Sequence, residues 1–562
     1  MLDLFTSRER IAYFSMEVAV QPDVPTYSGG LGILAGDILR SAADLDLPII
    51  GVSLASRRGY FRQTLTPEGQ QMEAPDTWEP AGVCTPLGAK VSVQIEGRSV
   101  WVAGWLYLVQ GHMGEQLPVL FLDTDLPENE PVDREFTHYL YGGDTRYRFK
   151  QEMILGIGGV RMLRALGFRI RKYHMNEGHA ALLPLELLRS SQASNEDVRP
   201  GESPFDIPFV RSLCDFTTHT PIGAGRDEFE YVLVADLLRG FMPENVLRQL
   251  GGAERLDMSR LAMNLSGYVN GVAKRHAETS RSLFPGYAVR AVTNGVHAYT
   301  WVSPAFAKMF DHHLPGWCNE PEILVRAECC VGADAIWQAH ADSKEELLQY
   351  VRQSTGLQLD ADRPILGFAR RMTAYKRPEL LFSDLERLKS IAQRAPFQIV
   401  LAGKAHPRDL EGKERIARIH AALRALAPTI KGVYLPNYDM RMAKLLVAGV
   451  DVWLNTPQPP LEASGTSGMK AAMNGVPSLS VLDGWWAEGC IEGVTGWAIG
   501  DGRVETAAGD AASLYQKLET VVLPLYENRT GWTNVMRGAI SRNGALFNSH
   551  RMMRRYASEA YL

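Results

Sequence analysis

The sequence predicts an α/β protein with two doubly wound domains. Short apolar runs alternate with longer segments of helical periodicity, a pattern typical of parallel sheets joined by crossover helices. The alternation runs through both halves of a chain of 562 residues, which is long enough for two or more domains that each bury a core. Because such sheets bind ligands beyond the carboxyl ends of their strands, we expect the functional site in a cleft between the domains.

In the first half, a strand, a glycine-rich turn and a helix follow one another. The strand is expected at 10–18, the turn lies in TYSGGLGILAGD (26–37), and the helix is expected over 32–47. A second strand at 48–56 completes a β–α–β unit, which favours parallel pairing. Further strands are expected at 169–177, at a run ending in 216–220 and at 287–295, with helices over 146–168, 179–191 and 257–284.

The second half repeats the alternation more clearly. The helix expected over 409–427 has Ile416, Ile419, Leu423 and Leu426 on one face. Strands are expected at 364–371, 397–404, 432–437, 450–455 and 477–484, and helices over 378–394, 440–449 and 467–475.

A helical connector separates the two predicted sheets, so we place the domain boundary within 296–360. The predicted division is an N-terminal domain at 1–300, a C-terminal domain at 301–530 and a segment at 531–562. This last segment is helical and follows the second sheet, and we expect it to return to the first domain.

Composition and charge exclude several classes of protein. Lys plus Arg is 59 and Asp plus Glu is 64, a net charge of −5 that favours neither nucleic acid nor an anionic membrane as a partner. No apolar run approaches the roughly 18 residues of a membrane helix. The first residues also lack the basic and apolar regions of a secretory signal, so we expect a cytoplasmic protein.

Cysteine and histidine spacing argues against a catalytic metal. The six cysteines form no CxxC pair and two of them are adjacent, so free thiols in a reducing cytosol are expected. The His and Glu spacings fit no zinc-protease pattern, and neither a GxSxG elbow nor a Walker A loop is present.

A basic loop follows one strand of the second half. FARRMTAYKRP (368–378) places Arg370, Arg371, Lys376 and Arg377 just beyond the carboxyl end of that strand. Four cations there suit a phosphate group, although a solvated basic loop has the same composition.

The segment PLEASGTSGMKAAMNG (460–475) is the most informative. Glu462 precedes a small, glycine-rich run with the hydroxyls of Ser464, Thr466 and Ser467, and Lys470 follows just inside the next helix. Such a run is a plausible phosphate cradle. The lysine suits either a point charge on phosphate or a covalent amine for a cofactor, and the residues alone leave both open.

Two further turns have weaker signals. Gly29 and Gly30 lie where a strand gives way to a helix, which suits close approach of a ligand or only a tight turn. Asn294 and His297 follow another strand, where an amide can bond sugar hydroxyls. Taken singly, each of these side chains is more often structural than functional.

Taken together, these motifs resemble the α-glucan phosphorylases, and in particular their short bacterial and archaeal form. EASGTSGMKAAMNG followed by SVLDGWW resembles the pyridoxal-phosphate site of that family. The resemblance extends through the chain in YFSMEVAV, TYSGGLGILAGD, MNEGHAALLPLELL, FTTHTPIGAG, TNGVHAYTW, GFARRMTAYKRPELLF, LAGKAHPRD and FNSHRMMRRY. It implies a GT-B fold, in which two Rossmann-like domains face a deep cleft and a C-terminal helix crosses back to the first domain.

The resemblance also implies roles for individual residues. Lys470 aligns with the lysine that carries pyridoxal 5′-phosphate, and Arg371 and Lys376 align with the cations that hold substrate phosphate. Residues aligned with contacts to the cofactor phosphate are Thr466, Ser467, Tyr438 and Lys376, and those aligned with substrate contacts are Gly29, Gly30, Leu31, Asn294, Glu462, Ser464 and Gly465.

The implied reaction is phosphorolysis of an α-1,4-glucan by inorganic phosphate, giving α-glucose 1-phosphate with retention. The cofactor's phosphate, rather than its ring, relays a proton to the substrate phosphate. Two phosphates in contact repel, so the basic loop and the glycine-loop dipoles are needed to neutralise them. A homo-oligomer is compatible with the sequence.

Two positions depart from the long animal-type enzymes. Gly267 and Thr373 stand where those enzymes have histidines. The chain also starts almost at its first strand, so we expect no N-terminal regulatory extension and no control by phosphorylation there.

Two alternatives belong to other classes. A GT-B sugar-nucleotide glucosyltransferase of the glycogen synthase type shares the glycine loop and the Glu before a glycine-rich run, but it needs no cofactor lysine. A non-catalytic glucan-binding or scaffold protein on the same fold is expected to lose Lys470 or Lys376, and both are present.

Overall fold

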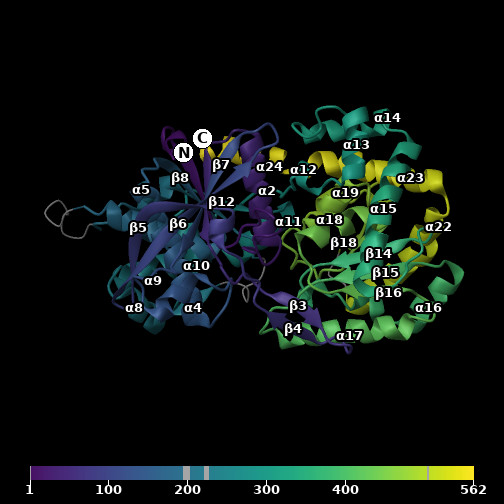
Figure 1. Cartoon of the computed structure of the whole chain (residues 1–562), viewed down its shortest axis with the longest axis horizontal. Coiled ribbons are helices and arrows are strands. Elements are labelled where there is room, and N and C mark those ends of the chain that lie inside the picture. Colours follow the sequence, from purple (N-terminus) through teal and green to yellow (C-terminus); the bar gives the residue numbers. More distant parts are fainter. Residues whose placement is uncertain (1, 194–202, 221–226, 503–505) are drawn as a thin grey trace.

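The fold is a mixed α/β arrangement around two mainly parallel sheets (Figure 1). A computed structural model describes residues 2–193, 203–220, 227–502 and 506–562. Strands of the first sheet lie between residues 10 and 291, and those of the second between 365 and 499. Part of the FTTHTPIGAG motif, residues 221–226, lies outside the described residues.

The first sheet has nine strands in the order β13-β12-β9-β8-β1-β2-β7-β6-β5. Its central strand, β1, pairs in parallel with β2 and β8, as the sequence predicts. The strands are β1 (Arg10–Ser15), β2 (Ile49–Leu54), β5 (Thr85–Ile95), β6 (Arg98–Gln110), β7 (Gln116–Asp123), β8 (Ile170–Asn176), β9 (Cys214–Thr217), β12 (Tyr268–Gly271) and β13 (Arg290–Ala291).

The antiparallel end of this sheet was not among the predicted strands. β5 and β6 form a hairpin, and β6 pairs antiparallel with β7. Glu96 and Gly97 connect β5 to β6 with φ angles of 56° and 79°, the left-handed conformations that a two-residue hairpin turn requires. The alternating pattern of strand burial at this edge is weaker than the continuous apolar runs of the central strands.

The single helix predicted over 257–284 is wrong. The segment forms α10 (Met258–Asn264), then β12, then α11 (Lys274–Leu283). A Cβ atom on Gly267 would lie 2.8 Å from the carbonyl oxygen of Arg211, so only glycine fits before β12. The buried YVNG strand then fills the sheet between β9 and β13.

The second sheet has six parallel strands in the order β16-β15-β14-β17-β18-β19. Its first five strands in sequence agree with the prediction, and β19 is additional. The strands are β14 (Ile365–Ala369), β15 (Gln398–Ala402), β16 (Gly432–Leu435), β17 (Val452–Asn455), β18 (Ser478–Val481) and β19 (Gly496–Ile499).

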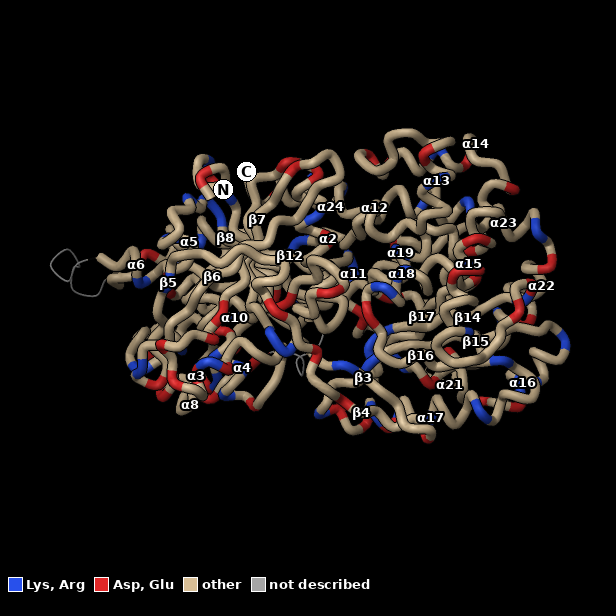
Figure 2. The backbone as a smooth tube through the Cα atoms, viewed as in Figure 1, with Lys and Arg blue, Asp and Glu red and all other residues tan. Residues whose placement is uncertain are grey.

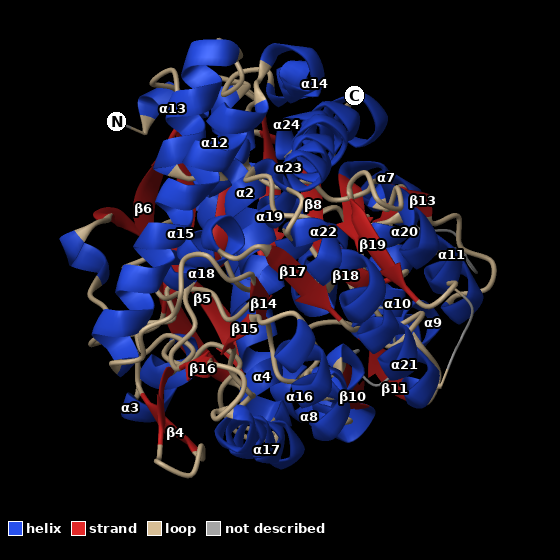
Figure 3. Ribbon diagram, turned by 90° about the vertical axis from the view of Figure 1, so that its right-hand side faces the viewer, coloured by secondary structure: helices blue, strands red, loops and turns tan. Residues whose placement is uncertain are grey.

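Helices surround the strands of both sheets (Figure 3). The four apolar residues predicted on one face of α17 are all buried. α16 begins at Leu385, later than predicted, because the side chain of Asp384 caps it by accepting from the N–H of Arg387. The longer helices are α2 (Gly30–Asp44), α4 (Thr145–Met153), α5 (Gly159–Ala165), α6 (Leu183–Ser190), α8 (Tyr231–Leu238), α9 (Glu244–Gly251), α13 (Pro304–His313), α15 (Ala333–Thr355), α16 (Leu385–Arg394), α17 (Leu410–Leu426), α18 (Met440–Gly449), α19 (Ser467–Met473), α21 (Ala507–Lys517), α23 (Arg529–Gly538) and α24 (Ser549–Tyr556).

The C-terminal segment returns to the first sheet. α24 lies beside α2 (Figure 1), and the hydroxyls of Ser549 and Ser41 hydrogen-bond between them. Beyond α24, the Tyr561 hydroxyl lies 2.7 Å from Nδ1 of His174 on β8. The C-terminal residues therefore cover part of the sheet that the N-terminal residues begin.

Positions of acidic and basic residues are interspersed along the backbone of both halves (Figure 2). Within the described ranges, no helix is long and apolar enough to cross a membrane. The six cysteines are free thiols, as predicted.

A buried ion network joins α15 to the second sheet. Asp451, just before β17, lies 2.9 Å from Nε2 of His340 and 2.8 Å from Nζ of Lys344, and it accepts from the N–H of Ile365. Burial raises the pKa of Asp451, but Lys344 and His340 outweigh it and hold the pKa at about 2. The carboxylate is therefore ionised and compensates the buried lysine.

We expect Asp451→Ala to destabilise the chain strongly, because it leaves the ammonium of Lys344 buried beside no carboxylate. The expected cost is about 3–5 kcal/mol in the free energy of unfolding. Denaturant unfolding followed by circular dichroism measures it. The control is Asp334→Ala on α15, the helix that carries Lys344. The Asp334 side chain is fully exposed, so the expected change is within about 0.5 kcal/mol. Equal effects of the two variants would contradict the role given to Asp451.

Candidate active site

A cavity of about 220 Å³ lies at the carboxyl ends of strands from both sheets. Segments that follow β1 and β13 line one side, and segments that follow β14, β15, β16 and β17 line the other. The structure brings to this cavity every residue to which the resemblance gives a role: Gly29, Gly30, Leu31, Asn294, Arg371, Lys376, Tyr438, Glu462, Ser464, Gly465, Thr466, Ser467 and Lys470. Arg377 of the basic loop does not line it and instead pairs with Asp510.

Glu462 is the centre of a buried cluster of charges. Its carboxylate lies 2.6 Å from Nζ of Lys376 and 2.7 Å from Nη2 of Arg370. Burial alone would raise the pKa of Glu462, but Arg370 and Lys376 outweigh it and hold the pKa at about 2. The backbone N–H of Glu462 donates to Asp483, which fixes the segment after β17. An arriving anion therefore meets cations that a fixed carboxylate already holds in place.

Arg371 stands apart from that cluster. Its side chain is accessible from the cavity and packs beside the glycine loop, since a Cβ atom on Gly29 would lie 3.4 Å from Cδ and Nε of Arg371. Burial lowers the pKa of Arg371, but Tyr375, Glu17 and neighbouring tyrosines outweigh it and leave the pKa above its usual value. The guanidinium thus stays charged at the place where an anion would enter.

The glycine loop is shaped by one carboxylate. Oε2 of Glu17 accepts from the N–H groups of Ser28 and Gly29 at 2.6 and 3.1 Å, and the Tyr141 hydroxyl donates to Oε1. A Cβ atom on Gly32 would lie 2.7 Å from Oε2 of Glu17, so this position requires glycine. The N–H of Gly29 is directed at Glu17, which differs from the expected contact of that group with a ligand.

Lys470 is buried against an aromatic ring. It lies on α19, and its Nζ is 3.7 Å from the ring centroid of Trp301. Burial lowers the pKa of Lys470 to about 8, with Asp37 acting in the opposite direction. The side chain of Asn474 donates to the backbone carbonyls of both Lys470 and Trp301, and so joins the two segments that carry the amine and the ring.

Several polar atoms of the residues that line the cavity lack partners. Among the residues that the structure describes, Oγ of Ser464, Oδ1 of Asn294, and Nε and Nη1 of Arg370 are buried without a hydrogen bond. Ser467 accepts from the indole N–H of Trp453, which orients its hydroxyl. Buried polar atoms without partners cost free energy, so this set fits a polar ligand.

Sequence reasoning missed some of the residues at the cavity. Trp301 is part of the TNGVHAYTW motif, but nothing in its spacing indicates that it meets Lys470. Lys404 follows β15, donates to the carbonyl of Phe61 and has its pKa lowered by burial to about 8. Its position after a strand, as for Arg370, was the available signal. His297 does not line the cavity and instead contacts Asp44.

A second cavity of about 610 Å³ adjoins the first. Ser28, Leu31, His219, Arg371 and Tyr375 line both. The second cavity is also lined by Glu17, Tyr60, Tyr141, Arg148, Glu177 and His406, so its wall combines aromatic and polar groups.

Comparison with known proteins shows the family of this chain. The family model described as carbohydrate phosphorylase matches residues 16–98 and 245–490. The chain is 37% identical to maltodextrin phosphorylase of Thermococcus litoralis, over 98% of the chain and 70% of the relative. It is also 37% identical to glycogen phosphorylase of Mycobacterium tuberculosis, with the same coverage, and 34% identical to that of Aquifex aeolicus, over 99% of the chain and 86% of the relative. The chain therefore belongs to the carbohydrate phosphorylase family.

Proposed function

We propose that the chain catalyses phosphorolysis of α-1,4-glucans to α-glucose 1-phosphate with retention, with pyridoxal 5′-phosphate bound at Lys470. The observation that carries the proposal is the shared cavity, in which a buried lysine of lowered pKa lies near three cations and a glycine loop. Relatives named maltodextrin phosphorylase and glycogen phosphorylase support the substrate class.

The residues present fit the cofactor. An amine with a pKa of about 8 is more often neutral near pH 7 than an ordinary lysine, which favours reaction with an aldehyde. The hydroxyls of Thr466 and Ser467 and the phenol of Tyr438 line the same cavity and suit its phosphate. When bound, the cofactor supplies a phosphate that exchanges a proton with substrate phosphate.

Arg371 and Lys376 are proposed to hold the substrate phosphate. Lys376 forms an ion pair with Glu462, so the carboxylate partly neutralises the positive charge before phosphate binds. Once phosphate binds, its oxygens take over the N–H groups of Lys376 and Arg371. This arrangement reduces the repulsion between two phosphates in one cavity.

The sugar that reacts is proposed to lie against Asn294, Glu462, Ser464 and Gly465. The unpartnered oxygens of Asn294 and Ser464 suit sugar hydroxyls, which both donate and accept. The adjoining cavity of about 610 Å³ is proposed to hold the rest of the glucan, because aromatic and polar side chains line it together.

The reaction balances without a metal or a redox step. The bond from C1 of the terminal glucosyl unit to the glycosidic oxygen breaks, and a bond from C1 to a phosphate oxygen forms. The proton of substrate phosphate passes to the departing glycosidic oxygen. Arg371 and Lys376 stabilise negative charge on the phosphate as that proton leaves.

We also propose the GT-B arrangement, with domains at 1–300 and 301–530 facing a deep cleft and a returning segment at 531–562. The gap between the last strand of the first sheet, ending at Ala291, and the first strand of the second, starting at Ile365, supports this division. The packing of α24 on α2 supports the returning segment. The unpaired thiols support a cytoplasmic location.

The sugar-nucleotide glucosyltransferase is not favoured. That reaction has no use for the buried Lys470 that lines the same cavity as the basic loop, and the family model matches the carbohydrate phosphorylases.

Borohydride reduction is expected to fix pyridoxal phosphate on Lys470. The protein loaded with cofactor is reduced, digested and mapped by mass spectrometry. Lys404 is the internal control, because it lines the same cavity and its pKa is also about 8. We expect the mass increase on Lys470 in the wild type and in Lys404→Met, and its absence in Lys470→Ala. Labelling of Lys404 instead would refute the assignment.

The rate of cofactor uptake is expected to rise with pH through about 8. Only the neutral amine attacks an aldehyde, and burial lowers the pKa of Lys470 from 10.5 to about 8, so the neutral fraction grows over that interval. Stopped-flow absorbance of cofactor-free protein mixed with pyridoxal phosphate, from pH 6 to pH 10 in roughly half-unit steps, measures the rate. A midpoint near the ordinary lysine value would contradict the proposed burial of the amine.

Arg371→Gln is expected to weaken phosphate binding and turnover while the fold stays intact, because the side chain is accessible and packs only at the cavity. We expect kcat/KM for phosphate to fall about 10²–10³-fold. Steady-state phosphorolysis at saturating maltodextrin measures it. Arg408→Gln is the matched control, since Arg408 lines only the second cavity and its loss is expected to leave KM for phosphate within about twofold. A wild-type KM for phosphate in Arg371→Gln would disprove the role.

A further inference from the structure

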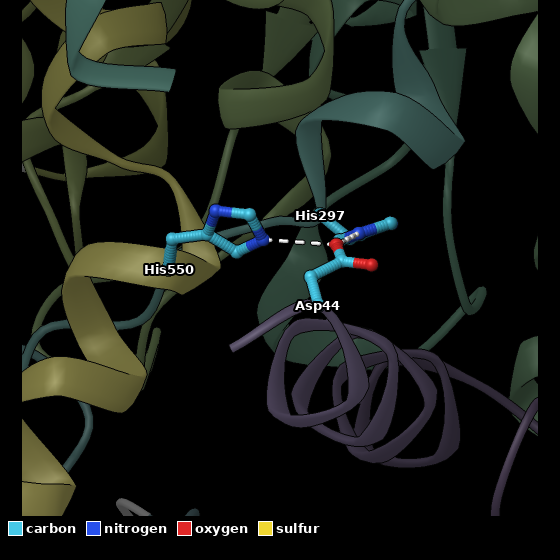
Figure 4. A group of neighbouring side chains, drawn as sticks. All are labelled: Asp44, His297 and His550. Carbon is cyan, nitrogen blue, oxygen red and sulfur yellow. Dashed lines mark hydrogen bonds and ion pairs between the residues drawn. The ribbon is translucent and has the colours of Figure 1, made fainter. Parts of the chain in front are cut away.

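Three side chains from distant parts of the chain converge outside both cavities (Figure 4). Asp44 ends α2, His297 follows the Asn294 loop, and His550 lies in the first turn of α24. Oδ2 of Asp44 lies 2.7 Å from Nε2 of His297 and 3.0 Å from Nε2 of His550. One ligand atom of each residue lies within 4.8 Å of the other two.

The outer hydrogen bond of His550 determines where its proton lies. Nδ1 of His550 is 3.1 Å from the carbonyl oxygen of Asn319, and because a carbonyl only accepts, Nδ1 must carry the proton. Nε2 of His550 faces the carboxylate oxygen of Asp44 at 3.0 Å. A cation between the two groups would be coordinated by Nε2 of the neutral ring and by the carboxylate.

We propose that this group binds a divalent transition-metal ion, with Zn²⁺ as the best match. The ligands are Nε2 of His297, Nε2 of His550 and Oδ2 of Asp44, and water completes the shell. Two imidazoles and a carboxylate are a donor set that zinc prefers. The site lies outside the cavities, so the proposal does not depend on the proposed function.

The spacing and the surroundings suit such an ion. Neighbouring ligands on zinc lie about 3.0–3.4 Å apart when each bond is about 2.1 Å, so small side-chain shifts would admit the ion. Each ligand is also oriented by a second contact, as metal ligands usually are. Thr300 Oγ1 lies 2.6 Å from Nδ1 of His297, and the N–H of His112 donates to Oδ1 of Asp44 at 2.6 Å.

The ion would join three elements that are far apart in the sequence. α2 begins at the glycine loop, and the His297 segment continues from Asn294 at the active-site cavity. Next to His550, Arg551 donates to the carbonyls of Thr293 and Asn294. A metal here would therefore fasten the C-terminal helix to the loop that carries Asn294. Its role is structural, because no ligand reaches either cavity.

The experiment titrates the full-length chain, stripped with a chelator, with zinc chloride. Elemental analysis after gel filtration is expected to give about one zinc per chain. Thermal unfolding is expected to show a melting temperature at least about 2 °C higher with zinc than with chelator. His550→Gln keeps an amide near Asp44 but removes the imidazole, and we expect it to bind zinc about 100-fold more weakly.

Two histidine variants serve as matched controls. His340→Gln removes a buried histidine paired with Asp451, and His312→Gln removes part of an adjacent histidine pair near the surface. Both are expected to retain one zinc with wild-type affinity. If His550→Gln does not fold, zinc binding by the wild type and by His312→Gln still tests the proposal. Unchanged zinc binding in His312→Gln shows that the surface histidine pair is not the zinc site.

Two results would overturn the proposal. One is an absence of zinc binding by the stripped wild type at micromolar concentrations. The other is equal zinc affinity in the wild type and in a folded His550→Gln variant. In the first case the three side chains form a hydrogen-bonded group only.

Discussion

The ion cluster around Glu462 is the interaction on which the cavity depends. Arg370 and Lys376 are buried beside the space proposed for phosphate, and burying two cations without a counter-charge costs several kcal/mol or more. Glu462 supplies that charge and also lines the space proposed for the sugar. The carboxylate thus stabilises the cations while the cavity is open to solvent, and it leaves them able to exchange one acceptor for another.

Around that cluster, each wall of the cavity is fixed by a polar contact from a neighbouring element. Glu17 sets the glycine loop through two backbone N–H groups, and Asn474 joins Lys470 to the segment that carries Trp301. The contact of Asn474 with Trp301 spans 173 positions of the sequence, whereas those of Glu17 are local. The site is therefore assembled by the packing of strand ends, and the side chains that touch a ligand are oriented by others that do not.

The sequence predicted most of the parallel strands. The residues to which the resemblance gives roles all line the cavity, because strand ends and their motifs are local signals. Prediction from the sequence failed where distant contacts decide the structure. Gly267 permits a strand within an apparent helix only because the carbonyl of Arg211 lies against it. β5 and β6 lack the continuous buried runs of central strands. The contact of Lys470 with Trp301 and the group at Asp44 bring together residues separated by more than a hundred positions, and no spacing rule reveals them.

The return of α24 to the first sheet has a consequence for the order in which the chain can fold. The sheet that starts at β1 is synthesised before the second sheet, yet the side chains that cover part of β8 and α2 are made after it. During translation that apolar face stays exposed to solvent until the second half has been synthesised. Exposed apolar surface in a partly folded large protein favours misfolding and aggregation. The first half therefore gains its full packing only after the second half has been synthesised.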